Sequence, residues 1–148
     1  MYDKTNPNKE FFMRIFLMIG LMGVALFAET TMVKDPAHHL MWEDTPHTRE
    51  TKVNYFQAKR YCNELILGKH KDWRVPTLME LLSIVDYRRY KPAIKKPLSY
   101  VEEESSYWTT TLYIGDSGSR WVVNFKDGAT SDASENYDRY VRCVRDDK

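Results

Sequence analysis

The stretch Asp72-Trp73-Arg74-Val75-Pro76-Thr77-Leu78-Met79-Glu80-Leu81-Leu82 decides the fold of this chain. Thr77 and Glu80 have the spacing of a capping box, in which a hydroxyl and a carboxylate satisfy backbone N–H groups at the start of a helix. Apolar residues follow at helical spacing, namely Leu78, Leu81, Leu82 and Val85. The stretch therefore predicts an amphipathic helix that begins sharply at Thr77 and ends near Asp86.

Upstream of this helix, the sequence predicts a strand, a loop and a second helix. Residues 38–42 have the pattern of a short first strand, and residues 43–50, which include a proline, predict a loop. Asn54 is a favourable cap for a helix. One face of that helix is apolar, comprising Tyr55, Ala58, Cys62 and Leu65. Gly68 stands where a helix C-cap is expected.

Downstream, a long irregular segment precedes a set of strands. Residues 87–106 carry two prolines and no regular period, and a connection this long in a compact domain is usually functional or mobile. Residues 107–113, 121–125 and 140–145 predict strands, and Lys126-Asp127-Gly128 predicts a hairpin turn into residues 129 and 130. In the last strand, Val141 and Cys143 alternate with larger or charged neighbours. Helices followed by antiparallel strands predict an α+β fold.

These segments also resemble the bacterial DUF1566 family, called the Lcl C-terminal domain family after a collagen-like adhesin. The resemblance runs from about Leu40 to Arg145 in the order of the family's motifs. It rests on Met41-Trp42-Glu43-Asp44, Ala58 with Tyr61-Cys62 and Leu65, Asp72 to Thr77 with Glu80-Leu81 and Val85-Asp86, Tyr107 to Thr110, Trp121 to Phe125, Asp127-Gly128, and Val141 to Arg145. It implies a C-type lectin-like fold: two helices packed on short antiparallel sheets, with a long irregular loop that commonly carries ligand contacts.

Length and composition predict one globular domain. The chain has 148 residues, of which 43% are hydrophobic and 14% aromatic, enough for a sizeable core. Its formal net charge of +1 gives no reason to expect a nucleic acid or an anionic membrane surface as partner.

The N-terminus has the pattern of a secretory signal. An uncharged apolar run, Ile15 to Ala28, follows Lys4, Lys9 and Arg14 and ends at a small residue. We therefore expect residues 1–28 to be a cleaved signal peptide, 29–37 a linker and 38–148 the folded domain. The other interpretation is a retained anchor, with membrane contact through residues 11–28. Either way the domain is expected to be exported, to the periplasm, the outer surface or the medium.

Export changes how the two cysteines are interpreted. An even, minimal number of cysteines in an oxidising compartment favours a disulfide, here between Cys62 and Cys143. The bridge would join the first helix to the last strand. A redox or metal-binding role is disfavoured, because the chain has no CxxC motif and two isolated cysteines make a poor metal site.

The first candidate binding site is a basic segment within the long loop. Its cations could contact sulfate, phosphate or carboxylate groups, and its tyrosine could stack on a sugar face. The founding adhesin of the family is associated with glycosaminoglycan binding, which favours this interpretation. The other interpretation is a solvated loop whose charge is neutralised by Glu102, Glu103 and Glu104. The candidate residues are Arg88, Arg89, Tyr90, Lys91, Lys95 and Lys96.

Metal sites are weaker candidates, and no cofactor is expected. Calcium needs six to eight oxygen ligands, which Asp116, Asn124, Asp127 and the three glutamates could supply in part. However, the Glu-Pro-Asn and Trp-Asn-Asp motifs of sugar-binding lectins are absent, and Asp127 is more simply a turn residue. Imidazoles and carboxylates can also bind zinc or copper. Adjacent histidines on a strand point to opposite faces, so we expect surface histidines rather than a site at His38, His39, His47, Glu43 and Asp44.

Two further groups of residues are expected to be structural. Trp42, Trp73, Trp108 and Trp121 could form a sugar platform, but all stand beside apolar positions and are expected in the core. Arg142 and Arg145 lie in the predicted last strand, where a structural ion pair is the default expectation.

The sequence as a whole favours a binding module. It contains no Gly-x-Ser-x-Gly, no HExxH and no phosphate-binding glycine loop, so we expect no enzymatic activity. The leading hypothesis is an exported, disulfide-stabilised binding or adhesion domain that presents the 87–106 and 113–120 loops to a glycan or protein partner. The alternative is a structural or assembly subunit of a bacterial envelope complex, tethered to the membrane if residues 11–28 are retained.

Overall fold

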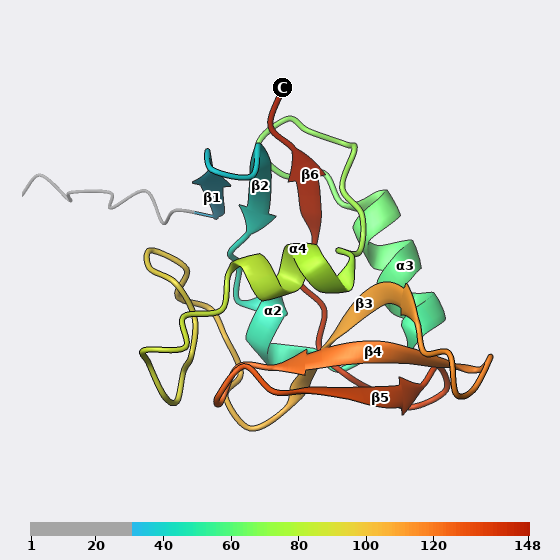
Figure 1. The fold of residues 1–148 in the computed structure, drawn as a ribbon. Helices are drawn as coiled ribbons and strands as arrows, with labels where there is room; N and C mark the ends of the chain where they lie inside the picture. The colour runs from blue at the N-terminus through green and yellow to red at the C-terminus, as the bar shows by residue number, and fades with distance from the viewer. Residues whose placement is uncertain (1–30) are drawn as a thin grey trace, which may run out of the picture.

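The computed structural model describes residues 31–148, which form two three-stranded antiparallel sheets and three short helices (Figure 1). The first sheet has the order β1-β2-β6 and brings the beginning and end of the described chain together. The second sheet has the order β3-β4-β5. The strands are β1 (Met32–Asp35), β2 (Leu40–Glu43), β3 (Ser106–Leu112), β4 (Ser119–Asn124), β5 (Thr130–Ser134) and β6 (Val144–Asp146).

The helices lie between and beside the sheets. They are α2 (His47–Glu50), α3 (Tyr55–Glu64) and α4 (Leu78–Ser83). In Figure 1, α4 crosses the centre of the molecule between the sheets, and α3 lies along one side. Two hydrophobic clusters hold the layers together. One packs Leu81 of α4 with Trp42 and Phe125, and the other packs Ala58 and Cys62 of α3 with Trp108. The α+β prediction is confirmed in this form.

The capping box at the start of α4 is formed as predicted. Glu80 N donates to Thr77 Oγ1 over 3.2 Å, and Thr77 N donates to a Glu80 carboxylate oxygen over 2.8 Å. Arg74 adds a two-pronged hydrogen bond to the same carboxylate, at 2.8 and 2.7 Å. Short-range chemistry therefore predicts where α4 begins, and Thr111 on β3 adds a long-range contact by accepting from Leu78 N over 2.9 Å.

The predicted end of α4 near Asp86 is wrong, because the helix ends at Ser83. Lys95 N donates to the Ile84 carbonyl over 2.9 Å, and Asp86 N donates to the Ala93 carbonyl over 3.2 Å. The long loop thus occupies backbone groups that a longer helix would have used.

Replacing Thr77 with alanine is expected to lower the free energy of unfolding by about 1 kcal/mol, because one helix-start N–H loses its acceptor. Urea unfolding followed by circular dichroism measures the change. Ser117→Ala, at an exposed position of the 113–120 loop, is the matched control and should unfold at the parent's midpoint. Equal midpoints for T77A and S117A would show that the cap contributes nothing.

The first part of the described chain differs from the prediction in three places. β1 lies inside the predicted linker 29–37 and pairs with β2 along its whole length. β2 begins at Leu40 rather than His38, because the chain turns there: His38 N donates to the Asp35 carbonyl over 3.2 Å, and His39 has a positive φ of 54°. The predicted loop 43–50 contains α2.

Among the described residues, two glycines have the positive φ that glycine permits, and one of them plays the predicted role. Gly128, at 82°, lies in the hairpin turn, and its N–H donates to the Asn124 carbonyl over 2.9 Å. Gly68, at 58°, lies in a tight turn between Leu67 and His70, whereas α3 already ends at Glu64. Gly68 is therefore not the C-cap of α3.

The last strand was expected to alternate between buried and exposed faces, and this is wrong. Val141, Arg142, Cys143 and Val144 are all fully buried, and regular strand pairing begins only at Val144. Tyr140 and Arg145 are buried as well, so no residue of the segment points to an exposed face. Arg142 can be buried because it has a buried carboxylate partner, described below.

Residues 1–28, the predicted signal peptide, lie outside the described residues. Within residues 31–148, no helix combines the length and the apolarity that crossing a membrane requires.

Candidate binding surface

The predicted disulfide between Cys62 and Cys143 is present. Cys62 lies on α3 and Cys143 directly precedes β6, and both are completely buried. The bond closes a loop with a sequence separation of 81 residues. It ties α3 to the end of the chain.

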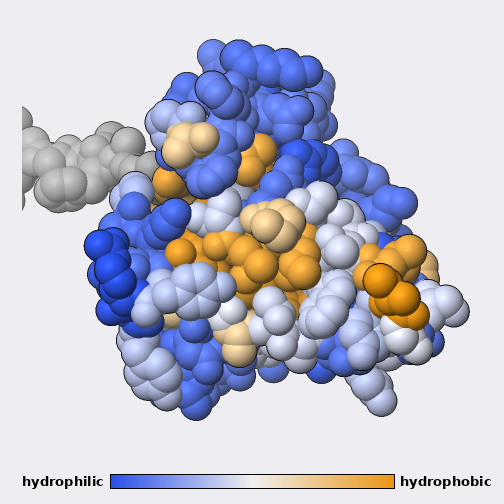
Figure 2. All heavy atoms as spheres, in the orientation of Figure 1, coloured by the Kyte–Doolittle hydropathy of each residue, from blue (hydrophilic) through white to orange (hydrophobic). Residues whose placement is uncertain are grey.

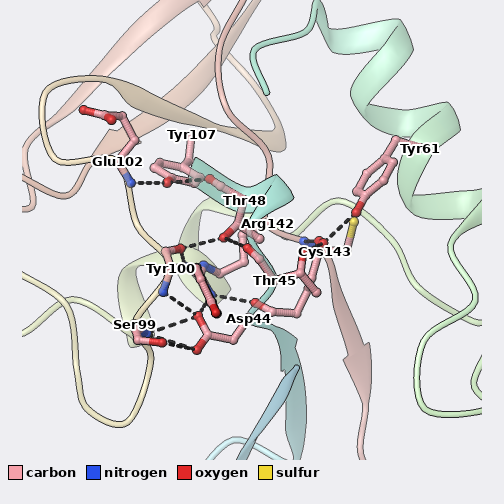
Figure 3. Close-up of polar contacts among 11 residues, drawn as sticks. Asp44, Thr45, Thr48, Tyr61, Ser99, Tyr100, Glu102, Tyr107, Arg142 and Cys143 are labelled. Atoms are coloured by element: carbon pink, nitrogen blue, oxygen red, sulfur yellow. Dashed lines mark hydrogen bonds and ion pairs between the residues drawn. The ribbon is translucent and has the colours of Figure 1, made fainter. Parts of the chain in front are cut away.

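Next to this bond, Arg142 and Asp44 form a buried ion pair (Figure 3). Arg142 is fully buried and Asp44 is 2% exposed; Arg142 Nη1 donates to Asp44 Oδ1 over 2.9 Å. The same Nη1 atom donates to the Glu43 carbonyl over 2.6 Å, and Nη2 donates to the Tyr100 carbonyl. A buried charge pair persists only with such additional hydrogen bonds. The prediction of structural ion pairs is confirmed here, and Arg145 makes the second one, with Asp72, at 2.8 Å.

Asp44 also anchors the end of the long loop. Its carboxylate accepts from Ser99 N, Ser99 Oγ and Tyr100 N at 2.9–3.1 Å. Thr48 Oγ1 donates to the Tyr100 carbonyl over 2.5 Å. Three segments far apart in sequence therefore meet at one carboxylate (Figure 3).

Glu43, the neighbour of Asp44, is fully buried and serves the other side of the network. Its carboxylate accepts from Thr45 Oγ1 at 2.7 Å, from Tyr61 Oη at 2.6 Å and from Cys143 N at 3.1 Å. Burial raises the pKa of Tyr61 far above its usual value, and the charge of Glu43 raises it further. Tyr61 therefore acts as a hydrogen-bond donor and joins α3 to β2, beside the disulfide that joins α3 to the chain before β6.

The middle of the 87–106 loop packs onto the body of the protein. Ala93, Ile94 and Leu98 are buried, and Ala93 N donates to the Phe125 carbonyl over 2.7 Å. The Lys91–Pro92 and Lys96–Pro97 peptide bonds are cis. The loop is irregular, as predicted, but it is attached to the body of the protein between the turn of residues 87–91 and the turn of residues 95–98.

The predicted ligand-binding residues lie on the exposed parts of this loop, with different neighbours. Arg88, whose side chain is 91% exposed, pairs with Asp86 at 3.1 Å and lowers the pKa of that carboxyl group. Lys91 pairs with Glu104 and lowers the pKa of Glu104. Tyr90 is 65% exposed. Within the described residues, no carboxylate lies within ion-pair distance of Arg89, Lys95 or Lys96. Of the three glutamates that could neutralise the basic segment, Glu104 pairs with one of its cations, Lys91.

Lys95 and Lys96 belong to a different part of the surface from Arg88 and Arg89. They line a cleft of about 220 Å³ between the 95–98 turn and β1, where Lys34 also lies. The structure therefore divides the predicted basic segment into two groups, one at the turn of residues 87–91 and one at this cleft.

The second predicted binding loop, 113–120, is exposed and carries an apolar tip. Ile114 is fully exposed and Leu112 is 53% exposed. Tyr113 packs edge-on against Trp121 with ring centroids 5.1 Å apart, and Trp121 is only partly buried. The core prediction is correct for the other three tryptophans, Trp42, Trp73 and Trp108, which are at most 2% exposed.

The oxygens proposed for calcium are engaged in turns. Asp116 accepts from Gly118 N and Ser119 Oγ, at 3.1 and 2.7 Å. Asn124 accepts from Lys126 N at 2.7 Å, and Asp127 accepts from Ala129 N at 2.9 Å. Residues 31–148 contain no group of three His, Cys, Asp or Glu side chains placed to hold a metal ion.

The histidines are also separated from one another. His38 pairs with Asp35 at 2.7 Å, and His47 stacks on Tyr61 with ring centroids 3.8 Å apart. The two carboxylates that could have joined them, Glu43 and Asp44, are acceptors in the buried network. The structural role of these two carboxylates was not predicted from the sequence. The ion pair expected for Arg142 was the available signal, because an arginine that becomes buried requires a carboxylate.

An apolar hollow lies on the face that Figure 2 presents, where hydrophobic residues gather over α4. It has a volume of about 530 Å³, and Leu40, Met79 and Leu82 line it together with His38, Glu80 and Ser83. Met79 is 74% exposed. Contiguous apolar surface of this kind is typical of sites that contact other proteins.

Comparison with protein families finds a match to the Lcl C-terminal domain over residues 31–145. The chain belongs to this family. The Lcl C-terminal domain begins one residue before β1, so β1 is part of the domain and not of a linker. The match includes both cysteines, the Asp44–Arg142 pair and the 87–106 loop. A search of curated proteins finds no match.

Proposed function

We propose that this Lcl C-terminal domain is an exported binding module of C-type lectin-like fold. In this module, the turn of residues 87–91 contacts an anionic group on a glycan or protein partner. The observation that supports this most is the contrast within one loop. Its end is fixed by the buried Asp44–Arg142 pair, while Arg88, Arg89 and Tyr90 are exposed.

Fixing the loop before binding has a physical advantage. A mobile loop loses conformational entropy when a partner orders it, and that cost reduces affinity. Here the hydrogen bonds of Ala93, Ser99 and Tyr100 fix the part of the loop that follows the turn of residues 87–91. Arg88 and Arg89 can then form charge-assisted hydrogen bonds with sulfate, phosphate or carboxylate at little ordering cost.

The disulfide supports export and a non-catalytic role in this proposal. Disulfides form and persist outside the reducing cytosol. The bond also occupies both cysteines, so neither thiol is available as a nucleophile. We propose that the domain works by binding, with no enzymatic activity and no resident cofactor.

The double variant R88E/R89E tests the proposal. On an array of acidic and neutral glycans, the purified protein is expected to bind acidic glycans, and R88E/R89E to lose at least about tenfold in affinity because two attractive charges become repulsive. The matched control is K59E/R60E, which makes the same charge change at two exposed positions of α3.

Control and variant together decide the result. Loss of binding in R88E/R89E alone supports the turn of residues 87–91 as the contact. Equal loss in both variants indicates a response to net charge rather than to a site, and an R88E/R89E variant that binds like the parent overturns the proposal.

A second candidate is a structural subunit of an envelope complex. The apolar surface over α4 favours it, because Met79 and Leu82 would be buried by a neighbouring subunit. Cell fractionation separates the two candidates. A membrane-bound protein with an uncut N-terminus favours the subunit, and a released, processed protein favours the binding module.

A further inference from the structure

A cleft between the open edge of β1 and the 95–98 turn has the features of a peptide-binding site. Its volume is about 220 Å³. The floor is apolar, with Val33, Trp42, Ile84 and Leu98. An apolar floor beside an open strand edge suits an extended chain, whose alternate side chains point to one side.

The rim of the cleft is basic. Lys95 and Lys96 line it without a carboxylate in ion-pair range among the described residues. Lys34 also lines it and pairs only at the surface, with Asp147 at 3.2 Å. The carboxylate at the rim, Asp35, is already paired with His38. The rim therefore favours a partner with negative charge.

A buried donor at the floor lacks an acceptor. Trp42 is completely buried and lines the cleft, and its Nε1 atom has no hydrogen-bond partner. Buried indole N–H groups usually find one, as Trp108 does by donating to the Val53 carbonyl over 2.8 Å. Trp73 also lacks a partner but does not line this cleft. Because Trp42 lines the cleft from beneath, a ligand bound there changes the surroundings of this indole.

The backbone of β1 provides the remaining feature. β1 is the outer strand of its sheet and pairs only with β2. Figure 1 shows no strand or helix of the described chain on its outer side. An edge strand leaves alternate N–H and C=O groups free to pair with another extended chain.

From these features we infer that the β1 edge and its cleft bind an extended segment of a protein partner that has an apolar side chain flanked by acidic ones on one of its faces. Its backbone pairs with Met32–Asp35, and the side chains of that face point to the cleft: the apolar one enters it and the acidic ones contact Lys95 and Lys96 at the rim. A sugar fits less well, because Trp42, the aromatic residue here, is buried and offers no ring face. The inference rests on the proposed binding function and adds a second contact, apart from the Arg88–Arg89 turn.

Nuclear magnetic resonance of the isotope-labelled protein tests the inference, because the indole N–H of Trp42 gives its own signal. The probe is the capped hexapeptide Glu-Ser-Val-Ser-Glu-Ser, whose alternate side chains place a valine between two glutamates on one face, and its lysine analogue Lys-Ser-Val-Ser-Lys-Ser is the charge control. We expect the acidic peptide alone to shift the Trp42 indole signal and the amide signals of Met32–Asp35. K95E/K96E is expected to bind it at least about tenfold more weakly, and R88E/R89E within about twofold of the parent.

Each other result overturns the inference. An equal response to both peptides, or no response to the acidic one, removes the charge argument. A response to D-glucuronate but not to the peptide assigns the cleft to an acidic sugar. A response that requires removal of residues 1–30 means that the chain's own N-terminal segment fills the cleft. Because K95E/K96E and R88E/R89E are read separately, failure here leaves the glycan-array result for the 87–91 turn standing, and the reverse also holds.

Discussion

Removal of the Cys62–Cys143 disulfide is expected to lower the free energy of unfolding by about 4–5 kcal/mol. The bond joins residues separated by 81 positions, and closing so long a loop restricts the unfolded chain strongly. Both cysteines are fully buried, so replacement by alanine also removes packing from the cluster that holds α3. For a domain of this size, the loss is a large share of the total stability.

Guanidinium unfolding measures this effect. The oxidised protein is compared with protein reduced under denaturing conditions and with C62A/C143A, to which reductant is added as a control. Reductant should shift the midpoint of the parent and leave that of C62A/C143A unchanged. Two titratable thiols in the denatured, unreduced protein would show that the bond does not form.

Replacement of Arg142 with methionine is expected to cost about 3–5 kcal/mol of stability. The change leaves Asp44, which is 2% exposed, without its cationic partner. The Glu43 carbonyl loses the Arg142 donor, and the Tyr100 carbonyl keeps Thr48 Oγ1 as a donor but loses Arg142. Breaking one side of a buried pair is costly because the other side can neither ionise favourably nor reach water. The loss also releases the end of the 87–106 loop, which Tyr100 anchors.

Three variants separate these contributions. R88M removes an exposed arginine from the same loop and should change stability by less than about 0.5 kcal/mol. The double variant D44N/R142M removes both charges but keeps an amide oxygen that can accept from Ser99 and Tyr100, and it should recover part of the stability that R142M loses. Hydrogen exchange at the Ser99 and Tyr100 amides should be faster in R142M than in R88M. Equal urea midpoints for R142M and R88M would contradict the structural role of the buried pair.

The two expected effects arise from adjacent residues. Cys143 is bonded to α3, and Arg142 holds the end of β2 and the end of the long loop. The chain just before β6 is therefore the point at which three segments are joined. This arrangement explains how a small domain can fix an irregular loop and still expose its turn of residues 87–91.

The best sequence predictions concerned interactions between near neighbours. Thr77 and Glu80 are three residues apart, and Asn54 and Gln57 form a second capping box at the start of α3. The turn at Gly128 is equally local. The disulfide was also predictable, because the sequence has two cysteines, which allow one pairing. The irregular 87–106 segment was recognisable from its prolines and its lack of a period.

The predictions failed where distant segments compete for the same groups. The end of α4 depends on Lys95 and Ala93, which bond to the backbone just after the helix. Arg142 is buried because Asp44, 98 positions away, lies beside it. The basic segment divides into two groups because Lys95 and Lys96 face β1, whereas Lys91 pairs with Glu104. Each outcome depends on which residues meet in space.

Local patterns in the chain were thus sufficient for the starts of α3 and α4, the hairpin turn, the cysteine pair and the family. For the helix starts and the turn, that information lies in hydrogen bonds between residues three or four positions apart. For the cysteines, it lies in the single pairing that two residues allow. Folding in three dimensions decided the helix end, the burial of Arg142 and Asp44, and the cleft beside β1. These depend on burial and on charge pairing between segments that have no fixed spacing in the sequence.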